Sequence, residues 1–397
     1  MKIRLTTIIL LTTLWGLHAQ GITHIDLTQA AFEGIKAEKI FKEIEIIPLE
    51  THKDALLSAS ASYYLTDKYI IAVGFLQGAY LFDRKTGAFI REVSSFGQGP
   101  NEYTGWVVPK CGFDEKNNVL FVDNGSYYKK PWKGFNIETN KVEFVNRPLR
   151  KDDNEIISAY APWLIKDNIY VSFCNNITGR DKIKLIVYDK NGNIIQKYPY
   201  YFTYDKKGRS HPNNNGIFYN YNGSTYFKEW NYCDTVFRVT EKNITPHIVF
   251  TMGDKQPSYY HQDNADYNKG KYFINFVYES NSFVLFNFLC YSETISINNF
   301  KSGSRESTYT YTGYYNKKSK QTYISSTSNL KKSGYTISNI PVNFYPISIN
   351  KNKEMIASIL PEELIKYKGK INTPYKQLLQ HVQEDDNPIV IIAKLKE

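Results

Sequence analysis

One hairpin pattern recurs along the chain at an interval of about fifty residues. It reads YLFDRKTGAFI (80–90), GFNIETNKVEF (134–144), LIVYDKNGNII (185–195) and VFRVTEKNITP (236–246), in each case an apolar strand, a polar turn and a second strand. The residues at the start of the turns, Asp83, Asn136, Asp189 and Arg238, lie 53, 53 and 49 residues apart. Such a period indicates a single structural unit repeated along the chain.

Two more apolar segments precede each of the first three hairpins. They are 61–65 and 69–74, 107–113 and 119–123, and 159–165 and 169–174; a fifth unit covers 272–278, 283–290, 308–315 and 321–326, and a sixth begins with 342–347 and 354–359. Four short strands per fifty residues are typical of a propeller blade. The 33 Tyr and 23 Phe, against 3 Met, also favour pleated surfaces. We predict an all-β, six-bladed β-propeller of four-stranded blades that forms a single domain over 20–397.

The C-terminal part of the chain departs from the repeat. Segments 361–368 and 374–383 each carry a proline near the first turn and are predicted to be short helices inserted in the last blade. A final strand is expected over 389–395. Pairing of this strand with 22–27 or with 44–49 would close the ring and remove an exposed sheet edge.

The first nineteen residues have the pattern of a secretory signal. Lys2 and Arg4 precede an apolar run over 5–15, and Ala19 offers a small residue before the expected cleavage. No cysteine follows, so a lipid anchor at this site is not predicted. No later stretch approaches the roughly 18 apolar residues that a membrane helix needs. We therefore expect an exported protein, periplasmic or secreted, without a membrane span.

The formal net charge is +10, of which Lys2 and Arg4 contribute two units. The basic residues are interleaved with Asp, Asn and Tyr, whereas a nucleic-acid-binding protein more often carries a basic stripe. We predict a solvated basic surface, no nucleic-acid partner and a monomer. A preference for acidic ligands stays open.

The chain has four cysteines, Cys111, Cys174, Cys233 and Cys290, each in or beside an apolar run. There is no C-x-x-C pair, so the spacing does not support a zinc ribbon or a thioredoxin-like site. Free buried thiols are favoured, and disulfides remain possible in an oxidising compartment.

The segment SFGQGPNEYTGW (95–106) raises the question of a nucleotide site, because glycine-rich loops cradle phosphates. A phosphate-binding fingerprint requires a following helix or a GK[ST] sequence, and neither is present. We predict a turn between two blades instead. Gly97 and Gly99 would permit positive φ, Pro100 would fix φ, and Glu102, next to Tyr103, would accept backbone N–H groups.

Three motifs carry a resemblance to a known family. The residues of 97–103 resemble the G-x-G-P-x-E-Y signature of a six-bladed β-propeller family of Bacteroidetes, related to NHL-type and TolB-like propellers. The segment IIPLET (46–51) is similar to that family's "ieyipLET", and DNPIV (386–390) resembles its closing "dNPv" strand. Asn101 replaces the more common glycine. The resemblance implies an exported propeller and supplies no defined activity or catalytic residues.

Two sets of residues are weak candidates for a site. His261, Asp263 and Asp266 lie in one polar loop at a spacing that could hold a divalent cation, although a solvated loop is the favoured interpretation. Four tyrosines near loops could stack on a sugar or a peptide, although packing between blades explains them as well. They are Tyr219, Tyr221, Tyr259 and Tyr260.

The sequence leaves two functional hypotheses. There is no G-x-S-x-G or HExxH motif, so a hydrolase or zincin site of these kinds has no support. We favour a non-catalytic binding or scaffold module of the cell envelope without a cofactor, with a glycan, a peptide or an envelope protein as the ligand. The alternative is a hydrolase or lyase, with or without a metal, at the mouth of the propeller channel, which rests on fold analogy alone.

Overall fold

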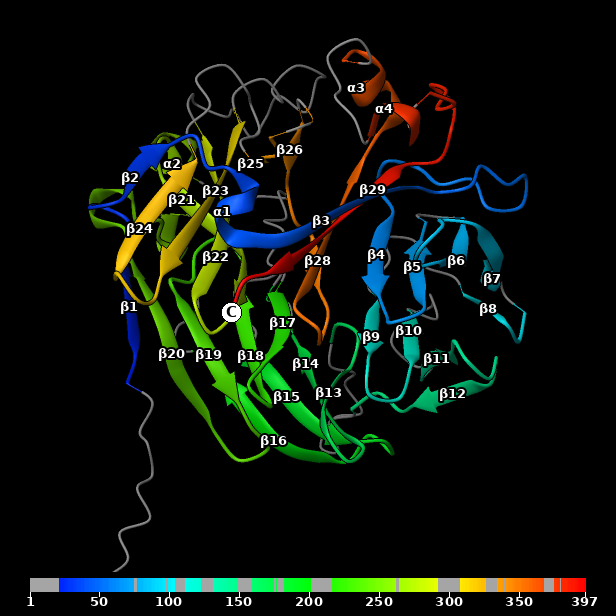
Figure 1. Ribbon diagram of the computed structural model, residues 1–397. Coiled ribbons are helices and arrows are strands. Elements are labelled where there is room, and N and C mark those ends of the chain that lie inside the picture. The colour runs from blue at the N-terminus through cyan, green and yellow to red at the C-terminus, as the bar shows by residue number, and fades with distance from the viewer. Residues whose placement is uncertain are drawn as a thin grey trace, which may run out of the picture.

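The structure is a computed structural model (Figure 1). It describes residues 21–74, 77–97, 99–103, 111–122, 131–148, 159–174, 176, 182–200, 216–261, 264–291, 308–325, 334–338, 340, 342–367, 375–378 and 380–397. Its described sheets are arranged as the six blades of a β-propeller, as the repeat predicts.

The first three blades are each built from one continuous part of the chain. Blade one contains β4 (Ser62–Leu65), β5 (Tyr69–Val73), β6 (Gly78–Asp83) and β7 (Phe89–Phe96), with the short β8 (Glu102–Tyr103) parallel to β7. Blade two contains β9 (Gly112–Asp114), β10 (Val119–Val122), β11 (Trp132–Asn136) and β12 (Val142–Val145). Blade three contains β13 (Trp163–Lys166), β14 (Ile169–Phe173), β15 (Ile183–Asp189) and β16 (Ile194–Pro199).

The last three blades take up strands from the N-terminal segment as well. Blade four contains β17 (Gly216–Tyr221), β18 (Ser224–Glu229), β19 (Thr235–Val239), β20 (Ile244–Thr251) and β1 (Thr23–Asp26). Blade five contains β21 (Tyr272–Glu279), β22 (Phe283–Tyr291), β23 (Thr308–Asn316), β24 (Gln321–Ser325) and β2 (Ala31–Glu33). Blade six contains β27 (Ser348–Ile349), β28 (Glu354–Ile359), β29 (Ile389–Leu395) and β3 (Phe41–Pro48).

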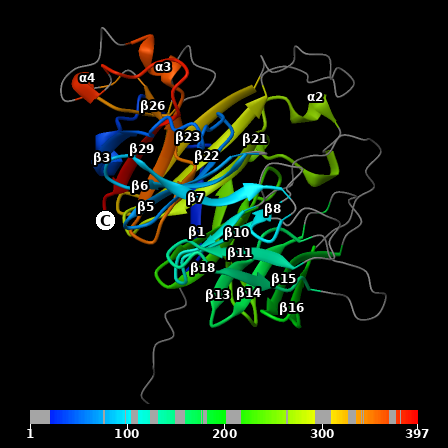
Figure 2. The same ribbon diagram turned by 90° about the vertical axis from the view of Figure 1, so that its right-hand side faces the viewer.

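Helical elements are short and lie between strands. They are α1 (Ala37–Ile40), η1 (Gly253–Lys255), η2 (Tyr259–His261), α2 (Ala265–Asn268), α3 (Pro361–Ile365) and α4 (Tyr375–Leu378); β25 (Tyr335–Thr336) and β26 (Asn343–Phe344) form a separate pair. Figure 2 shows α2 on one side and α3 and α4 on the other, at the same end of the ring. Among the described residues, no helix combines the length and the apolar character that a bilayer crossing requires.

We call residues 23–48 the belt, because they follow the outer rim of three blades (Figure 1). β1 adds a parallel strand to β20, β2 adds one to β24, and β3 pairs antiparallel with β29. The second of the two predicted closures therefore forms, through β3 and β29. The first, pairing of 22–27 with the last strand, is wrong, because β1 lies on blade four instead.

The repeated polar residue shapes the turn between the two outer strands of a blade. The side chain of Asp83 accepts from the backbone N–H of Thr86 at 2.8 Å, and Asn136 accepts from that of Thr139 at 2.9 Å. Asp189 and Asn316 make the same kind of bond, to Asn191 at 2.9 Å and to Ser319 at 3.0 Å. An Asx turn of this kind suits a short reversal, so the period marks the same turn in blades one, two, three and five. In blade four, Arg238 lies inside β19 instead.

The apolar residues form one large core cluster and four smaller ones. The large cluster joins the belt to blades four, five and six and includes Ile25, Phe41, Phe250, Phe286 and Ile391. The smaller clusters fill the joints between blades six and one, one and two, two and three, and three and four. The N-terminal belt is thus part of the main core.

Turns that follow the innermost strands hold three blades together at the face opposite α2. Glu115 of blade two accepts from the backbone N–H of Lys351 of blade six at 2.7 Å. Asn352 donates to Asp67 of blade one at 2.5 Å. Burial raises the pKa of the Glu115 carboxyl to about 7, and the nearby Asp114 and Asp67 add to this effect.

The sixth repeat begins later than predicted. The inner strand of blade six is β27, whereas most of the predicted 342–347 strand belongs to the connection and to β26. β26 pairs with β25, so this segment has its partner strand outside the blade. The predicted strand over 107–113 falls largely outside the described residues, and only Gly112–Asp114 is seen as β9.

Candidate functional site

A cavity of about 670 Å³ opens where blades three, four and five meet. We call it the tyrosine cavity. Its wall contains four tyrosines, four charged side chains and several small or apolar residues. They are Lys184, Tyr232, Cys233, Asp234, Thr235, Phe237, Gly253, Asp254, Gln256, Pro257, Ser258, Tyr259, Tyr260, Tyr267 and Lys271.

Three separate parts of the chain build the cavity. Lys184 comes from β15, and residues 232–237 come from the β18–β19 connection and the start of β19. The remaining residues lie in the crossover from β20 to β21. Asn264 caps α2 by accepting from the backbone N–H of Tyr267 at 2.9 Å, which fixes the turn that carries this tyrosine.

Aromatic rings form one wall of the cavity. The rings of Tyr232 and Tyr259 lie 5.5 Å apart at 39°. Tyr260 is 69% exposed, whereas the ring of Tyr267 packs against His261 at 4.1 Å. The ammonium group of Lys271 lies 4.7 Å from the Tyr267 ring centroid. The wall therefore combines rings held by their neighbours with one ring open to solvent.

Lys184, which lines the cavity, belongs to a buried ion pair. Lys184 Nζ is 2.6 Å from Glu229 Oε2, and the two side chains are 6% and 0% exposed. The ammonium group also lies between the rings of Tyr200 and Phe237, at 5.2 and 5.5 Å. Burial raises the pKa of the Tyr259 hydroxyl well above its usual value, and the charge of Glu229 raises it further. Tyr259 thus stays a neutral hydrogen-bonding group.

A second buried lysine anchors the same corner. Lys228 donates to the carbonyl oxygens of Glu229, of Cys233 at 2.6 Å and of Ile274 at 3.1 Å. Burial lowers the pKa of this amine to about 8. Since Ile274 belongs to β21, Lys228 ties the cavity-forming turn of blade four to blade five.

Two of the predicted stacking residues, Tyr259 and Tyr260, lie in the cavity wall. The other two do not reach it. Tyr219 and Tyr221 are 1% and 9% exposed, and each contacts the Tyr226 ring. These two tyrosines have little open ring surface for a ligand, because they pack between blades four and five.

The predicted cation loop lies beside the same cavity. His261 ends η2, and Asp266 is an exposed residue of α2. Asp263 lies outside the described residues. Within the part of the chain that the structure describes, no group of three or more His, Cys, Asp or Glu side chains could hold a metal ion.

The predicted turn motif lies between blades one and two. Glu102 Oε2 accepts from the backbone N–H of Gly99 at 2.6 Å, and the Tyr103 hydroxyl donates to the Gly74 carbonyl at 2.8 Å. Neither Gly97 nor Gly99 has positive φ, so the reason expected for the glycines is wrong. Lack of space for a side chain explains the glycine at position 97, because a Cβ there would lie 2.0 Å from Glu102 Oε2. A stabilising role for the motif, Pro100 included, stays a prediction.

All four cysteines are free in the structure, including Cys233 in the cavity wall. Cys174 and Cys233 are buried, and Cys111 and Cys290 are partly buried. The Tyr64 hydroxyl donates to the carbonyl of Cys111 at 2.9 Å. The buried thiol of Cys174 takes part in core packing.

Sequence reasoning missed the charged residues of the cavity. Lys184 lies inside the apolar strand IKLIVYD, and Glu229 ends STYFKE. A charged side chain in a strand buried on both faces requires a partner. The presence of Lys184 and Glu229 in such strands was therefore the signal that the sequence offered. The partner of each could not be identified, because the two residues come from different blades.

The comparisons with known proteins assign a family. A model described as "Domain of unknown function (DUF4934)" matches residues 22–394, so the chain belongs to the DUF4934 family. No curated protein matches the sequence.

Solved structures show a similar fold. A Bacteroides fragilis protein described as "Putative exported protein" is 15% identical, with a TM-score of 0.68 over 95% of this chain and 100% of that protein. BamB of Moraxella catarrhalis is 10% identical, with a TM-score of 0.37 over 79% of this chain and 75% of BamB. The first of these likenesses concerns the fold, and the second is too distant to support an argument.

Proposed function

We propose that this protein is an exported binding propeller of the cell envelope and that the tyrosine cavity binds a glycan. The observation that carries the proposal is the composition of the cavity wall. Tyrosine rings can stack on the C–H faces of a sugar, while adjacent carboxylate, amine and amide groups bind its hydroxyls. Tyr260 offers an exposed ring, and Asp234 and Gln256 offer polar groups in the same cavity wall.

Export is supported by the signal-like residues 1–19, which we infer are removed to leave one propeller domain over 20–397. The similar fold of a Bacteroides fragilis protein described as exported supports the same inference. A periplasmic or secreted location and kinship with NHL or TolB-like propellers belong to this proposal. A peptide or an envelope protein stays the alternative ligand of this cavity.

The proposal is tested with purified protein of residues 21–397 on an array of bacterial and host glycans, followed by calorimetry on the glycans that bind. Tyr260→Ala should weaken binding at least tenfold with an unchanged melting temperature, because the ring is exposed. Phe144→Ala is the matched control, since Phe144 is 47% exposed on blade two. Equal affinity of the Tyr260 variant and the parent would contradict the assigned cavity.

The same glycans provide the test against the enzyme hypothesis. Each binding polysaccharide is incubated with the protein, and the products are separated by chromatography. We expect an unchanged polymer, because the proposal gives the cavity a binding role. Release of shorter chains by the parent protein, and not by the Tyr260 variant, would show that the cavity is an active site.

A further inference from the structure

The outer edge of blade six is formed by β3, the closing strand of the propeller. Leu49 donates its backbone N–H to the Pro388 carbonyl at 3.4 Å, in the register that β3 keeps with β29. In an antiparallel pair, alternate residues exchange hydrogen bonds with the partner strand. Ile44 and Ile46 therefore direct their N–H and C=O groups away from β29.

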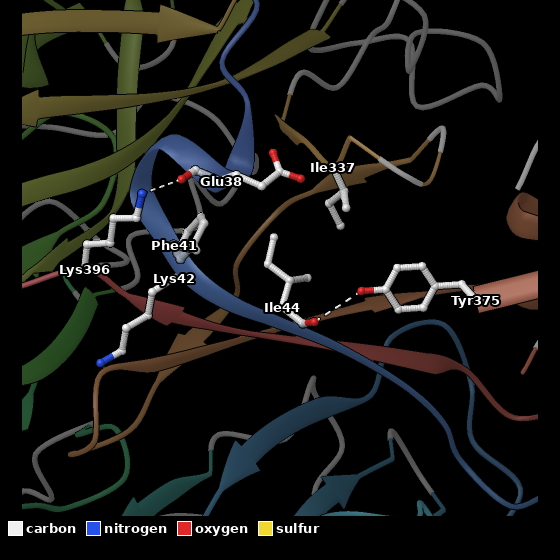
Figure 3. Close-up of a pocket in the computed structure, with 7 residues that line it drawn as sticks. All are labelled: Glu38, Phe41, Lys42, Ile44, Ile337, Tyr375 and Lys396. Carbon is white, nitrogen blue, oxygen red and sulfur yellow. Dashed lines mark hydrogen bonds between the residues drawn. The ribbon is translucent and has the colours of Figure 1, made fainter. Parts of the chain in front are cut away.

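At the two preceding blades, the belt itself covers the corresponding edge. β1 pairs with β20 over four residues, and β2 pairs with β24 over three. Within the described residues, no strand pairs with the outer edge of β3. The Tyr375 hydroxyl of α4 donates to the Ile44 carbonyl at 3.3 Å (Figure 3). This is a long hydrogen bond.

A cavity of about 350 Å³ lies along this edge. Figure 3 shows Phe41 and Ile44 of β3 on one side of it and Ile337 and Tyr375 on the other. Glu38 and Lys396 complete its lining. Lys42 lines the same cavity, and its ammonium group makes no ion pair with any described residue. The edge thus combines outward backbone groups with a hollow whose wall is partly apolar and partly charged, Lys42 included.

We propose that the outer edge of β3 binds an extended segment of a partner protein as an additional strand. The backbone of the segment would pair with Ile44 and Ile46, in place of the Tyr375 hydroxyl. Apolar side chains at alternate positions would enter the hollow beside Ile44 and Ile337. An Asp or Glu at the next alternate position would pair with Lys42.

A second copy of the chain is a poor occupant of this edge. Antiparallel pairing of two β3 edges centred on Ile44, or between Ile44 and Ile46, places Glu43 against Glu45 or Glu45 against Glu45. The register that centres Ile46 on Ile46 avoids this contact but sets Ile44 opposite Pro48, which has no N–H to donate. Like charges directly opposite each other destabilise a strand pair. The edge therefore favours a different protein that supplies the acidic residue for Lys42.

The test uses a fluorescent peptide, TETVTVTET, whose pattern is the same in both directions. Fluorescence anisotropy with the protein of residues 21–397 should show saturable binding. Two peptides that carry N-methyl groups on alternate sets of residues serve as controls, because only one set of N–H groups can face β3. One N-methylated peptide should bind at least tenfold more weakly, and the other should bind like the parent peptide.

Charge reversal tests the role of Lys42. The peptide TKTVTVTKT should bind about tenfold more weakly to the parent, and Lys42→Glu should reverse this preference without changing the circular dichroism spectrum. Tyr375→Phe should retain or increase the affinity, because it removes the group that occupies the Ile44 carbonyl. Absence of saturable binding at millimolar peptide, or equal loss with both N-methylated peptides, would overturn the proposal.

Discussion

Blades one to three and blades four to six contain the same four-stranded unit, but they close their outer edges differently. Among the described residues, β12 and β16 have no further strand beside them, and β7 has only the two-residue β8. In contrast, β20 and β24 are covered by β1 and β2 of the belt, and β3 of the belt forms the outer strand of blade six. Phe144 of β12 and Ile195 of β16 are 47% and 46% exposed, while Ile25 of β1 is fully buried. We call the two parts the bare half and the belted half. The difference shows that stability in the belted half depends on residues more than two hundred positions away in the sequence.

The largest effect on stability is expected from loss of β29, the strand that joins the belt to the ring. Deletion of 388–397 removes β29, whose Ile389, Val390 and Ile391 are fully buried. A buried aliphatic side chain contributes roughly 2 kcal/mol, so the strand contributes about as much as the typical total of 5–15 kcal/mol. Circular dichroism should show no cooperative melting. Deletion of 396–397 alone is the control, and an unchanged melting curve for the longer deletion would refute the closure.

Removal of the belt ahead of β3 should weaken one half selectively. Deletion of 21–36 exposes the β20 and β24 edges and removes Ile25, Leu27 and Ile35 from the large core cluster. Hydrogen exchange should accelerate in β20 and β24 and stay unchanged in β12 and β16. Uniform acceleration across all six blades would show that the two halves unfold as one unit and would remove the distinction.

A matched pair of substitutions measures the same contrast at single residues. Ile25→Ala in β1 should lower the free energy of unfolding by about 3 kcal/mol, because a fully buried side chain leaves a cavity. Ile195→Ala in β16 should lower it by less than about 0.5 kcal/mol, since the side chain is 46% exposed. Urea unfolding checks both values. Similar losses would mean that the belt adds little beyond an ordinary outer strand.

The smallest expected effect concerns the bare half and its contact with blade six. The pKa of Glu115 is about 7 in the folded protein, against 4.5 for an ordinary glutamate side chain, so the folded protein binds the extra proton between these values. The contribution of Glu115 to stability should be highest below about pH 4.5, fall as the pH rises to about 7, and then level off, by roughly 2–3 kcal/mol in total. Glu115→Gln should remove this part of the pH dependence in urea unfolding.

Asp167→Asn is the control for the Glu115 measurement, because Asp167 lies in the equivalent turn of blade three and its side chain is 79% exposed. This variant should keep the fall in stability between about pH 4.5 and 7. The interpretation fails if Glu115→Gln keeps the same fall.

Prediction from sequence worked where a local pattern repeats. The strand over 389–395 was placed with its observed bounds, since a buried apolar run follows Asn387-Pro388. The helices of 361–368 and 374–383 were predicted too long, because the described α3 and α4 keep only five and four residues of them. The start of blade six was predicted too early. The segment 342–347 has the apolar pattern of an inner strand, but its β26 pairs with β25 outside the blade.

The candidate site was only partly predictable for a related reason. Tyr259 and Tyr260 stood out in a polar crossover, and they line the tyrosine cavity. Tyr219 and Tyr221 looked similar in sequence, yet they are buried between blades. Burial of a ring depends on the neighbouring blade, which lies many residues away in the chain.

The sequence by itself determined the repeating unit of this protein. Strand alternation, the polar residue of each outer turn and the fifty-residue period all follow from contacts between residues close in the chain. Only the tertiary structure decided the path of the belt, the position of β3 as the outer strand of blade six and the contact of Lys184 with Glu229. These features depend on how blades are arranged around the ring, and the physical reason is that packing between distant segments leaves no periodic trace in the sequence.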